Sequence, residues 1–197
     1  MNVTVNGNTI DITIEDEQTV GDVLRGLEEE FAKNNATTIS IVLNGEKIAA
    51  DAFDRAAQTP LAADTALELT VVSEGDVTAA FAAEAKASRD IALQLEQIPV
   101  QLQSGKDKTA NVIITQLADL VDNVCHTASL AALFPDLYAK LAVDGKSITE
   151  FFAEFSDILN DFRQALEDKD TVLIGDLAEY EISPRLIALA DAVETQG

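Results

Sequence analysis

The stretch Thr19–Lys33, TVGDVLRGLEEEFAK, decides the fold of the first third of the chain. Its apolar residues recur at the i, i+3, i+4, i+7 spacing of a helix with one buried face: Val20, Val23, Leu24, Leu27 and Phe31. The side chain of Thr19 can accept a hydrogen bond from a free backbone amide at the helix start, and Asp22 completes a capping-box pattern. The stretch therefore predicts an amphipathic helix against which neighbouring strands pack as a sheet.

The residues before this helix alternate between apolar and polar side chains. Val3 and Val5 share one face of a first strand, and Asn6–Asn8 is typical of a tight hairpin turn. A second strand returns over residues 10–14 with its three isoleucines on one face. These residues predict a β-hairpin that leads into the helix.

More strands are predicted after the helix. The pattern favours strands over Ile39–Leu43 and Thr65–Val72, with a short helix over Ala52–Gln58 between them. Asn44-Gly45 closes the first of these strands. The predicted order is hairpin, helix, strand, short helix, strand.

This order resembles ubiquitin and its β-grasp relatives over residues 1–73. The resemblance is carried by the strand that begins at Met1, by VLNGEKI at residues 42–48 and by TALEL at residues 65–69. It implies a ubiquitin-like β-grasp domain, which we place at residues 1–74. Modifiers and sulfur carriers of this fold use a free Gly-Gly end, whereas residues 72–76 run on into more protein and Thr195–Gly197 holds one glycine. Conjugation and sulfur carriage are therefore not expected.

The resemblance also indicates a surface for partners on the sheet. Val42 aligns with the exposed isoleucine of the recognition patch of ubiquitin, and Glu68 and Thr70 are its neighbours on the last strand. A β-branched residue is also ordinary in a strand, so two interpretations of Val42 stay open. The functional interpretation is a partner surface more polar than that of ubiquitin.

From residue 75 the pattern changes to long helices, which predicts an all-α domain over residues 75–197 after a polar linker at Ser73–Gly75. Asp76 is expected to cap a first helix that ends at Pro99. The predicted helices cover residues 76–97, 107–126, 136–143, 148–168 and 171–194. The fold class is therefore α+β, a β-grasp domain followed by a helical bundle of about four long helices.

Three features of this domain give sharper expectations. Ser147 and Glu150 form a capping box before a helix that carries four of the eight phenylalanines, so this helix is expected at the bundle centre. Pro184 interrupts the last helical pattern and predicts a kink. Asp170–Leu186, DTVLIGDLAEYEISPRL, resembles the closing segment of certain uncharacterised bacterial helical domains, which implies no activity.

An acidic cluster, Asp176, Glu179 and Glu181, surrounds the expected kink. It is either a solvated helix face or a contact for a protein partner. A calcium loop beginning at Asp168 is not expected, because Val172 and Leu173 stand where a ligand and the turn glycine belong.

The sequence offers no clear catalytic constellation. Cys125 and His126 are the only cysteine and histidine, and adjacent helical residues point about 100° apart, so they cannot act as nucleophile and base. We expect Cys125 to be a small core residue and His126 a surface residue. The protein is predicted to be no enzyme and to hold no metal or cofactor.

The net charge of −22 limits the classes of partner. Residues 1–75 hold 14 acidic and 4 basic side chains, and the rest hold 21 and 9, so both halves are acidic. Nucleic acid and anionic membranes are poor partners for such a surface. A basic protein partner, a salty habitat and plain solubility all fit the charge. No signal peptide or membrane span is predicted, which favours the cytoplasm.

These observations favour a non-enzymatic, intracellular protein–protein interaction adaptor or scaffold. The alternative is an acidic export or assembly chaperone, related to secretion or flagella, that binds an amphipathic client segment. A homo-oligomer formed through the helical domain stays open.

Overall fold

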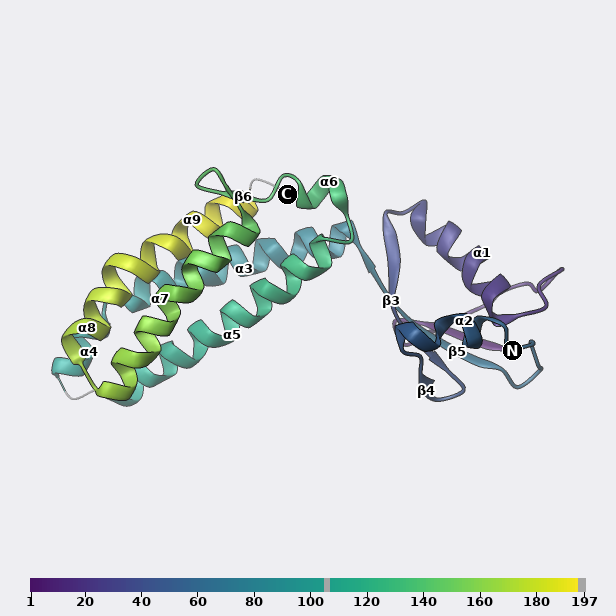
Figure 1. Ribbon diagram of the computed structural model, residues 1–197, viewed down its shortest axis with the longest axis horizontal. Coiled ribbons are helices and arrows are strands. Elements are labelled where there is room, and N and C mark those ends of the chain that lie inside the picture. Colours follow the sequence, from purple (N-terminus) through teal and green to yellow (C-terminus); the bar gives the residue numbers. More distant parts are fainter. Residues whose placement is uncertain (105–106, 195–197) are drawn as a thin grey trace. The chain divides into compact units, whose positions relative to one another are not determined.

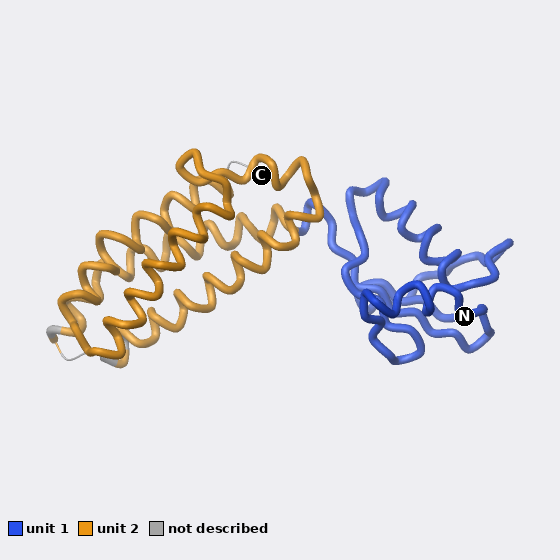
Figure 2. The backbone as a smooth tube through the Cα atoms, in the orientation of Figure 1, with its two compact units in different colours: residues 1–76 blue, residues 77–197 orange. Residues whose placement is uncertain are grey.

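The computed structural model describes residues 1–104 and 107–194 of the chain. The protein is mixed α+β, with a small sheet and many helices (Figure 1). It divides into two compact units, residues 1–76 and residues 77–197 (Figure 2).

The first unit is a five-stranded sheet with one long helix. The strands lie in the order β2-β1-β5-β3-β4, with β1 and β5 parallel and the other pairs antiparallel. The elements in chain order are β1 (Asn2–Val5), β2 (Asn8–Ile10), α1 (Val20–Ala32), β3 (Ala36–Leu43), β4 (Glu46–Lys47), the 3-10 turn η1 (Ala50–Ala52), α2 (Phe53–Ala57) and β5 (Ala66–Ser73).

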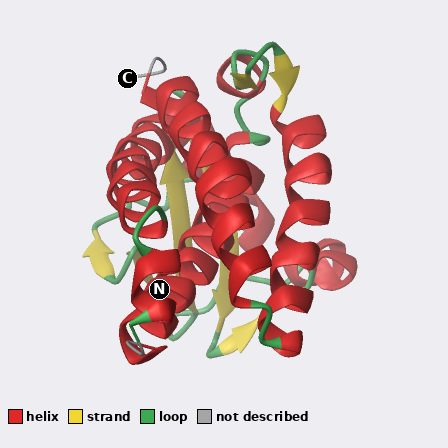
Figure 3. Cartoon of the chain, turned by 90° about the vertical axis from the view of Figure 1, so that its left-hand side faces the viewer, coloured by secondary structure: helices red, strands yellow, loops and turns green. Residues whose placement is uncertain are grey.

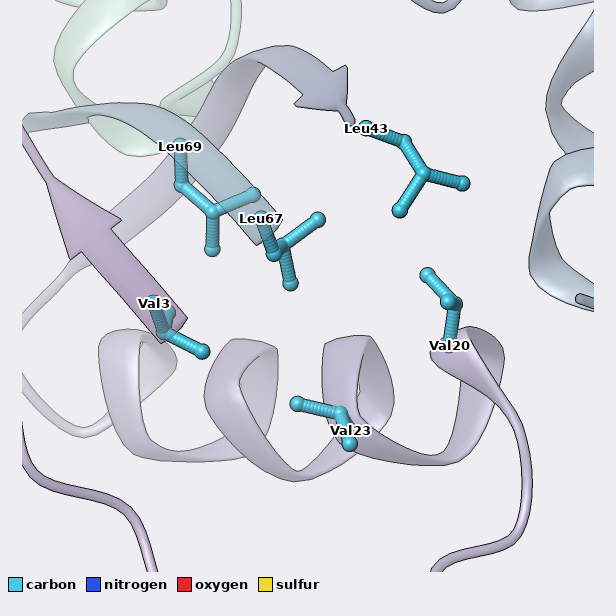
Figure 4. Close-up of a cluster of buried hydrophobic side chains, with 6 residues drawn as sticks. All are labelled: Val3, Val20, Val23, Leu43, Leu67 and Leu69. Atoms are coloured by element: carbon cyan, nitrogen blue, oxygen red, sulfur yellow. The ribbon is translucent and has the colours of Figure 1, made fainter. Parts of the chain in front are cut away.

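Helix α1 begins where its sequence predicts. The Thr19 hydroxyl accepts the amide of Asp22, and the Asp22 carboxylate accepts the amide of Thr19 at 3.0 Å, which confirms the capping box. One face of α1 packs on the sheet, and side chains from three strands point toward it (Figure 4). The centre of this core is Val3, Val20, Val23, Leu43, Leu67 and Leu69.

The predicted second strand is too long. Strand β2 ends at Ile10, and the side chain of Ile14 is 40% exposed. The reason is that β2 pairs only with the four-residue β1, whose Val3 lies opposite Ile10. Beyond this pair the partner strand has almost ended, so apolar alternation alone cannot extend the ladder.

The second unit consists of helices and one small hairpin. The long helices lie side by side, as two views of the chain show (Figures 1 and 3). The elements are α3 (Glu74–Leu95), α4 (Ile98–Gln103), α5 (Asp107–Ala131), α6 (Pro135–Tyr138), β6 (Ala142–Val143), β7 (Lys146–Ser147), α7 (Ile148–Asp168), α8 (Thr171–Asp176), the π-helical turn η2 (Leu177–Ile182) and α9 (Ser183–Glu194).

The predicted polar linker does not exist as a loop. Ser73 is the last residue of β5, and α3 starts at the next residue. Ser73 rather than Asp76 is the cap, because its hydroxyl accepts the amide of Asp76 and donates to the Asp76 carboxylate at 2.7 Å. The prediction placed the capping residue three positions too late.

Two other boundaries also differ from the prediction. Pro99 is the second residue of α4 instead of only ending the preceding helix, because the first turn of a helix does not need the missing amide. Residues 136–143 are a single turn of helix followed by a strand. Asp144 and Gly145 both have positive φ and form the hairpin turn between β6 and β7.

The last helical pattern is interrupted by a π-helical turn before Pro184. The Ser183 amide bonds to the carbonyl of Ala178, one residue further back than in an α-helix. Pro184 is then the second residue of α9, where a missing backbone donor is tolerated. The interruption was predicted, and the π-turn is the form that it takes.

Helix α7 supplies aromatic side chains to the core of the second unit. Its capping box at Ser147 and Glu150 is confirmed. Phe151, Phe155 and Phe162 are buried, and the rings of Phe151 and Phe155 lie 5.6 Å apart. Among the helices of residues 1–104 and 107–194, none is both long and apolar enough to cross a bilayer.

Candidate functional site

The predicted sheet surface is formed by neighbouring strands. Val42 on β3 lies directly opposite Glu68 on β5, and Thr70 lies two residues further along the same face. Lys47 and Thr4 extend the row on the flanking strands. The structure thus brings the three predicted residues together on a mostly polar face, opposite the face that packs on α1.

The predicted acidic cluster is divided by its neighbours. The Glu181 carboxylate pairs with the Arg185 guanidinium at 2.7 Å. Glu179 accepts a hydrogen bond from the Tyr180 hydroxyl, and its charge together with that of Asp176 also raises the tyrosine pKa. Glu181 is therefore partly neutralised, and Asp176 and Glu179 are the more open part of the cluster.

Cys125 is not a core residue, so that prediction is wrong. It is exposed on α5, where Val124, Thr127 and Ala128 are the buried positions. Partial desolvation raises the pKa of its thiol, and the nearby charges of Asp122 and Glu84 raise it further. The thiolate is disfavoured, which argues against a nucleophile.

A groove runs between α1, α2 and β3 in the first unit, with a volume of about 420 Å³. We call it the α1–β3 groove. Its lining is mostly apolar, with Glu28 and Arg25 as its charged members, and Arg25 is paired with Asp22. The lining residues are Gly21, Leu24, Arg25, Glu28, Thr38, Ile41, Phe53 and Ala57.

The Glu28 carboxylate is held in place by β3. One oxygen accepts the hydroxyl of Thr37 at 2.7 Å. The other accepts the hydroxyl of Thr38 at 2.8 Å and its amide at 3.4 Å. The ion pairs within residues 1–76 join Arg25 to Asp22 and Lys33 to Glu30, so no basic residue of this unit neutralises Glu28.

A second groove, of about 500 Å³, lies between α3 and α5. We call it the α3–α5 groove, and its acidic members are Glu84, Asp90 and Asp119. One oxygen of Glu84 accepts the hydroxyl of Thr127 at 2.6 Å, whereas the other is buried without a partner. Burial raises the pKa of Glu84, and the Thr127 hydrogen bond and His126 only partly oppose it.

A third groove, of about 320 Å³, lies between α5 and α7. We call it the α5–α7 groove. It is lined chiefly by aliphatic side chains and Phe162, with Asp122 and Arg163 as its charged members. The aliphatic residues are Ile114, Leu117, Val121, Leu159 and Leu166.

Sequence reasoning missed all three grooves. Thr37 and Thr38, which position the carboxylate of Glu28, lie 9 and 10 positions further along the chain, on β3 rather than on α1. Thr127, which bonds to Glu84, lies 43 positions away on another helix. No local motif marks such pairs. Within the part of the chain that the structure describes, no group of three or more His, Cys, Asp or Glu residues is placed to hold a metal ion.

Comparison with known proteins places both units in families. Residues 1–73 match the family model of the TP0873 N-terminal domain. Residues 87–192, more than half of the chain, match the model of a domain of unknown function, DUF8042. The chain belongs to the DUF8042 family. This DUF8042 protein therefore has a two-domain architecture.

A relative shows the same two-domain extent. The DUF8042 protein is 30% identical, over 193 residues, to an uncharacterized protein of Treponema pallidum (strain Nichols). The similarity covers 98% of this chain and 96% of that protein. No solved structure matches the chain. Glu28 lies in the first matched domain, and Thr127 lies in the second.

Proposed function

We propose that this DUF8042 protein is a non-enzymatic cytoplasmic adaptor or scaffold that binds protein partners. The observation that carries the proposal is the α1–β3 groove, where an apolar lining surrounds a carboxylate fixed by two threonines. A hydrophobic surface with a carboxylate held in a fixed position suits recognition of a polypeptide side chain. The acidic character of the chain makes a basic partner the best fit.

The proposal includes an assignment of each unit to a fold. For the first unit we propose a ubiquitin-like β-grasp, supported by the strand order β2-β1-β5-β3-β4, the parallel β1–β5 pair and one helix on one face. For the second we propose a bundle of four helical rods, supported by α3, α5, α7 and the composite α8–η2–α9.

In the proposed function, each unit has its own surface for binding a partner. The first unit offers the α1–β3 groove and, as a second contact, the polar face around Val42, Glu68 and Thr70. The second offers the α5–α7 groove, the acidic pair Asp176 and Glu179, or a surface for a second copy of the chain. Neither unit needs a cofactor in this role.

Crosslinking with the full chain tests the adaptor proposal. Wild type and two variants, Leu24→Asp in the α1–β3 groove and Val121→Asp in the α5–α7 groove, are compared with Lys86→Asp as a control outside these grooves. The expected result is that each groove variant loses a different specific partner and keeps the other. Identical partner sets for all four proteins would refute the proposal.

The α5–α7 groove favours the second candidate function, a chaperone for a secreted or assembled client. An amphipathic client helix could place its apolar face on Leu117, Val121 and Leu159, with charged residues facing Asp122 and Arg163. We expect a one-to-one complex with such a client, lost on Val121→Asp. Unimpaired secretion and assembly in a deletion strain would count against this function.

A further inference from the structure

Strand β3 has an open edge beside the α1–β3 groove. On one side β3 pairs with β5 from Ala36 to Leu43, with an irregularity of register between Thr38 and Ser40. On the other side it pairs with β4 only at Val42 and Leu43, and the carbonyl of Ile41 accepts one more hydrogen bond from Ile48. Within residues 1–76, the ladder therefore leaves residues 36–40 of β3, about 16 Å of strand, without a second neighbouring strand.

The backbone of Thr38 points to this open edge. Its partner in register is Val71, whose amide and carbonyl both bond to the side chain of Asn6, at 2.8 Å and 3.0 Å, on the far side from β3. Val71 and Thr38 are therefore a non-hydrogen-bonded pair, and Thr38 directs its own amide and carbonyl away from β5. The amide meets only the long contact to Glu28.

Apolar side chains continue along the same edge. A second hollow, of about 400 Å³, shares Thr38, Ile41 and Phe53 with the α1–β3 groove. It extends the apolar lining to Ile39 and Ile48. Ile39 and Phe53 are 42% and 40% exposed, which is high for large apolar residues so close together. An extended chain beside β3 would cover both.

The charge at this edge determines what can bind. Glu28 uses three hydrogen bonds of the roughly four that a carboxylate can accept. The three donors are neutral and Arg25 of the same groove pairs with Asp22, so Glu28 has no ion-pair partner within residues 1–76 and one acceptor position is free. A lysine or arginine of a partner can occupy it, and the surrounding apolar surface would strengthen the interaction by excluding water.

We propose that the open edge of β3 binds an extended segment of a protein partner. The segment adds to β3 at residues 36–40, places a lysine or arginine on Glu28 and lays an aliphatic or aromatic side chain on Phe53 and Ile39. The carbonyl of Thr38 accepts a backbone hydrogen bond of the segment, which fixes its register, and Glu28 selects its charge. This inference rests on the proposed adaptor function and names the partner chemistry of its first contact.

A peptide-display selection on the full chain tests the inference. The probe is a library of random heptapeptides, selected in parallel on wild type, Glu28→Gln and Glu29→Gln. In Glu28→Gln the new amide oxygen can still accept a threonine hydroxyl, so the groove is preserved while its charge is removed. Glu29→Gln is the matched control, because it makes the same charge change on an exposed residue outside the groove.

The inference predicts that wild type and Glu29→Gln enrich peptides with a basic residue next to an apolar one. Affinity for these peptides should fall about tenfold or more on Glu28→Gln, and should also fall at high salt. Phe53→Ser should weaken binding without changing the selected charge. Amide signals of residues 36–40 should shift in NMR spectra on addition of a selected peptide.

Three results would overturn the inference. They are selected peptides without a cation, equal binding to Glu28→Gln, and shifts that avoid residues 36–40. If the selected peptides instead lose affinity on Val121→Asp, the adaptor function stands and its contact lies in the second unit. A library that yields no enriched sequence on wild type would refute the inference, while the crosslinking comparison still decides the adaptor proposal.

Discussion

Glu28 in the first unit and Glu84 in the second each accept a hydrogen bond from a threonine hydroxyl, but their surroundings differ. Both oxygens of Glu28 have donors, from Thr37 and Thr38 on an open strand edge. Glu84 has one donor, Thr127, and its second oxygen is buried without a partner between two helices. Hydrogen bonds to both oxygens favour the charged form of a carboxylate, whereas burial of an oxygen without a donor favours the protonated form.

The largest expected effect comes from removing the single donor of Glu84. Thr127→Val keeps the shape of a buried side chain but leaves both carboxylate oxygens without a partner, which should destabilise the second unit by about 1–3 kcal/mol. Denaturant unfolding followed by tyrosine fluorescence measures this, because Tyr138 and Tyr180 both lie in the second unit.

The matched substitution in the first unit is Thr38→Val. Glu28 keeps the Thr37 hydroxyl and the Thr38 amide, so the cost should stay below about 1 kcal/mol. The change in stability is measured by hydrogen exchange of the amides in residues 1–76, because this unit contains no tyrosine whose fluorescence could report its unfolding. Equal costs for the two threonines would mean that the second oxygen of Glu84 has a solvent partner, and the contrast would disappear.

The floor of the α1–β3 groove provides the next test. A Cβ atom on Gly21 would lie 2.9 Å from the Ala57 carbonyl oxygen, so Gly21→Ala must push α2 away from α1 at a cost of about 1–2 kcal/mol. Gly26 on the same helix has open space, and Gly26→Ala should instead stabilise by about 0.5–1 kcal/mol. Hydrogen-exchange protection of the α1 amides should therefore decrease in Gly21→Ala and increase in Gly26→Ala. Equal protection in both variants would exclude a close contact at Gly21.

The raised pKa of Glu84 predicts a pH dependence. An unfolded glutamate titrates near 4.5, so between that value and the higher folded pKa the folded chain binds more protons than the unfolded chain. Stability should therefore fall as pH rises through this window. Glu84→Gln should remove this part of the slope for the second unit, measured by unfolding between about pH 4 and 7. A slope unchanged by Glu84→Gln would contradict the predicted role of burial.

The smallest effect is expected for Glu28→Gln without a ligand. The amide oxygen still accepts a threonine hydroxyl at a half-buried position, so stability should change by less than about 0.5 kcal/mol in the hydrogen-exchange assay. A loss several times larger would mean that Glu28 chiefly holds β3 to α1. The charge would then be structural, and the contrast with Glu84 would weaken.

Local sequence predicted the parts of the fold that depend on neighbours in the chain. The capping boxes at Thr19 and Ser147 and the hairpin turn at Asn6-Gly7 were all predicted, because each depends on a few adjacent residues. The end of β2 was not, since it depends on the length of a partner strand. Cys125 was misplaced because the buried stripe of α5 follows its neighbouring helices rather than the apolarity of one residue.

The candidate sites divide in the same way. The surface around Val42, Glu68 and Thr70 was predicted from the resemblance to β-grasp domains, and the register of the strands makes Val42 and Glu68 direct neighbours. The acidic cluster was visible as a run of charges, but Arg185 pairs with only one of its members. The groove residues were invisible, since each wall comes from a different element.

The sequence by itself determined the two-part α+β organisation, the acidic charge and most element starts, because these follow from composition, periodicity and short-range hydrogen bonds. The tertiary structure decided which carboxylates have enough donors, where β3 lacks a neighbour and which helices leave grooves between them. These properties depend on groups brought together across up to 65 positions of chain, and local patterns carry no record of such distant partners.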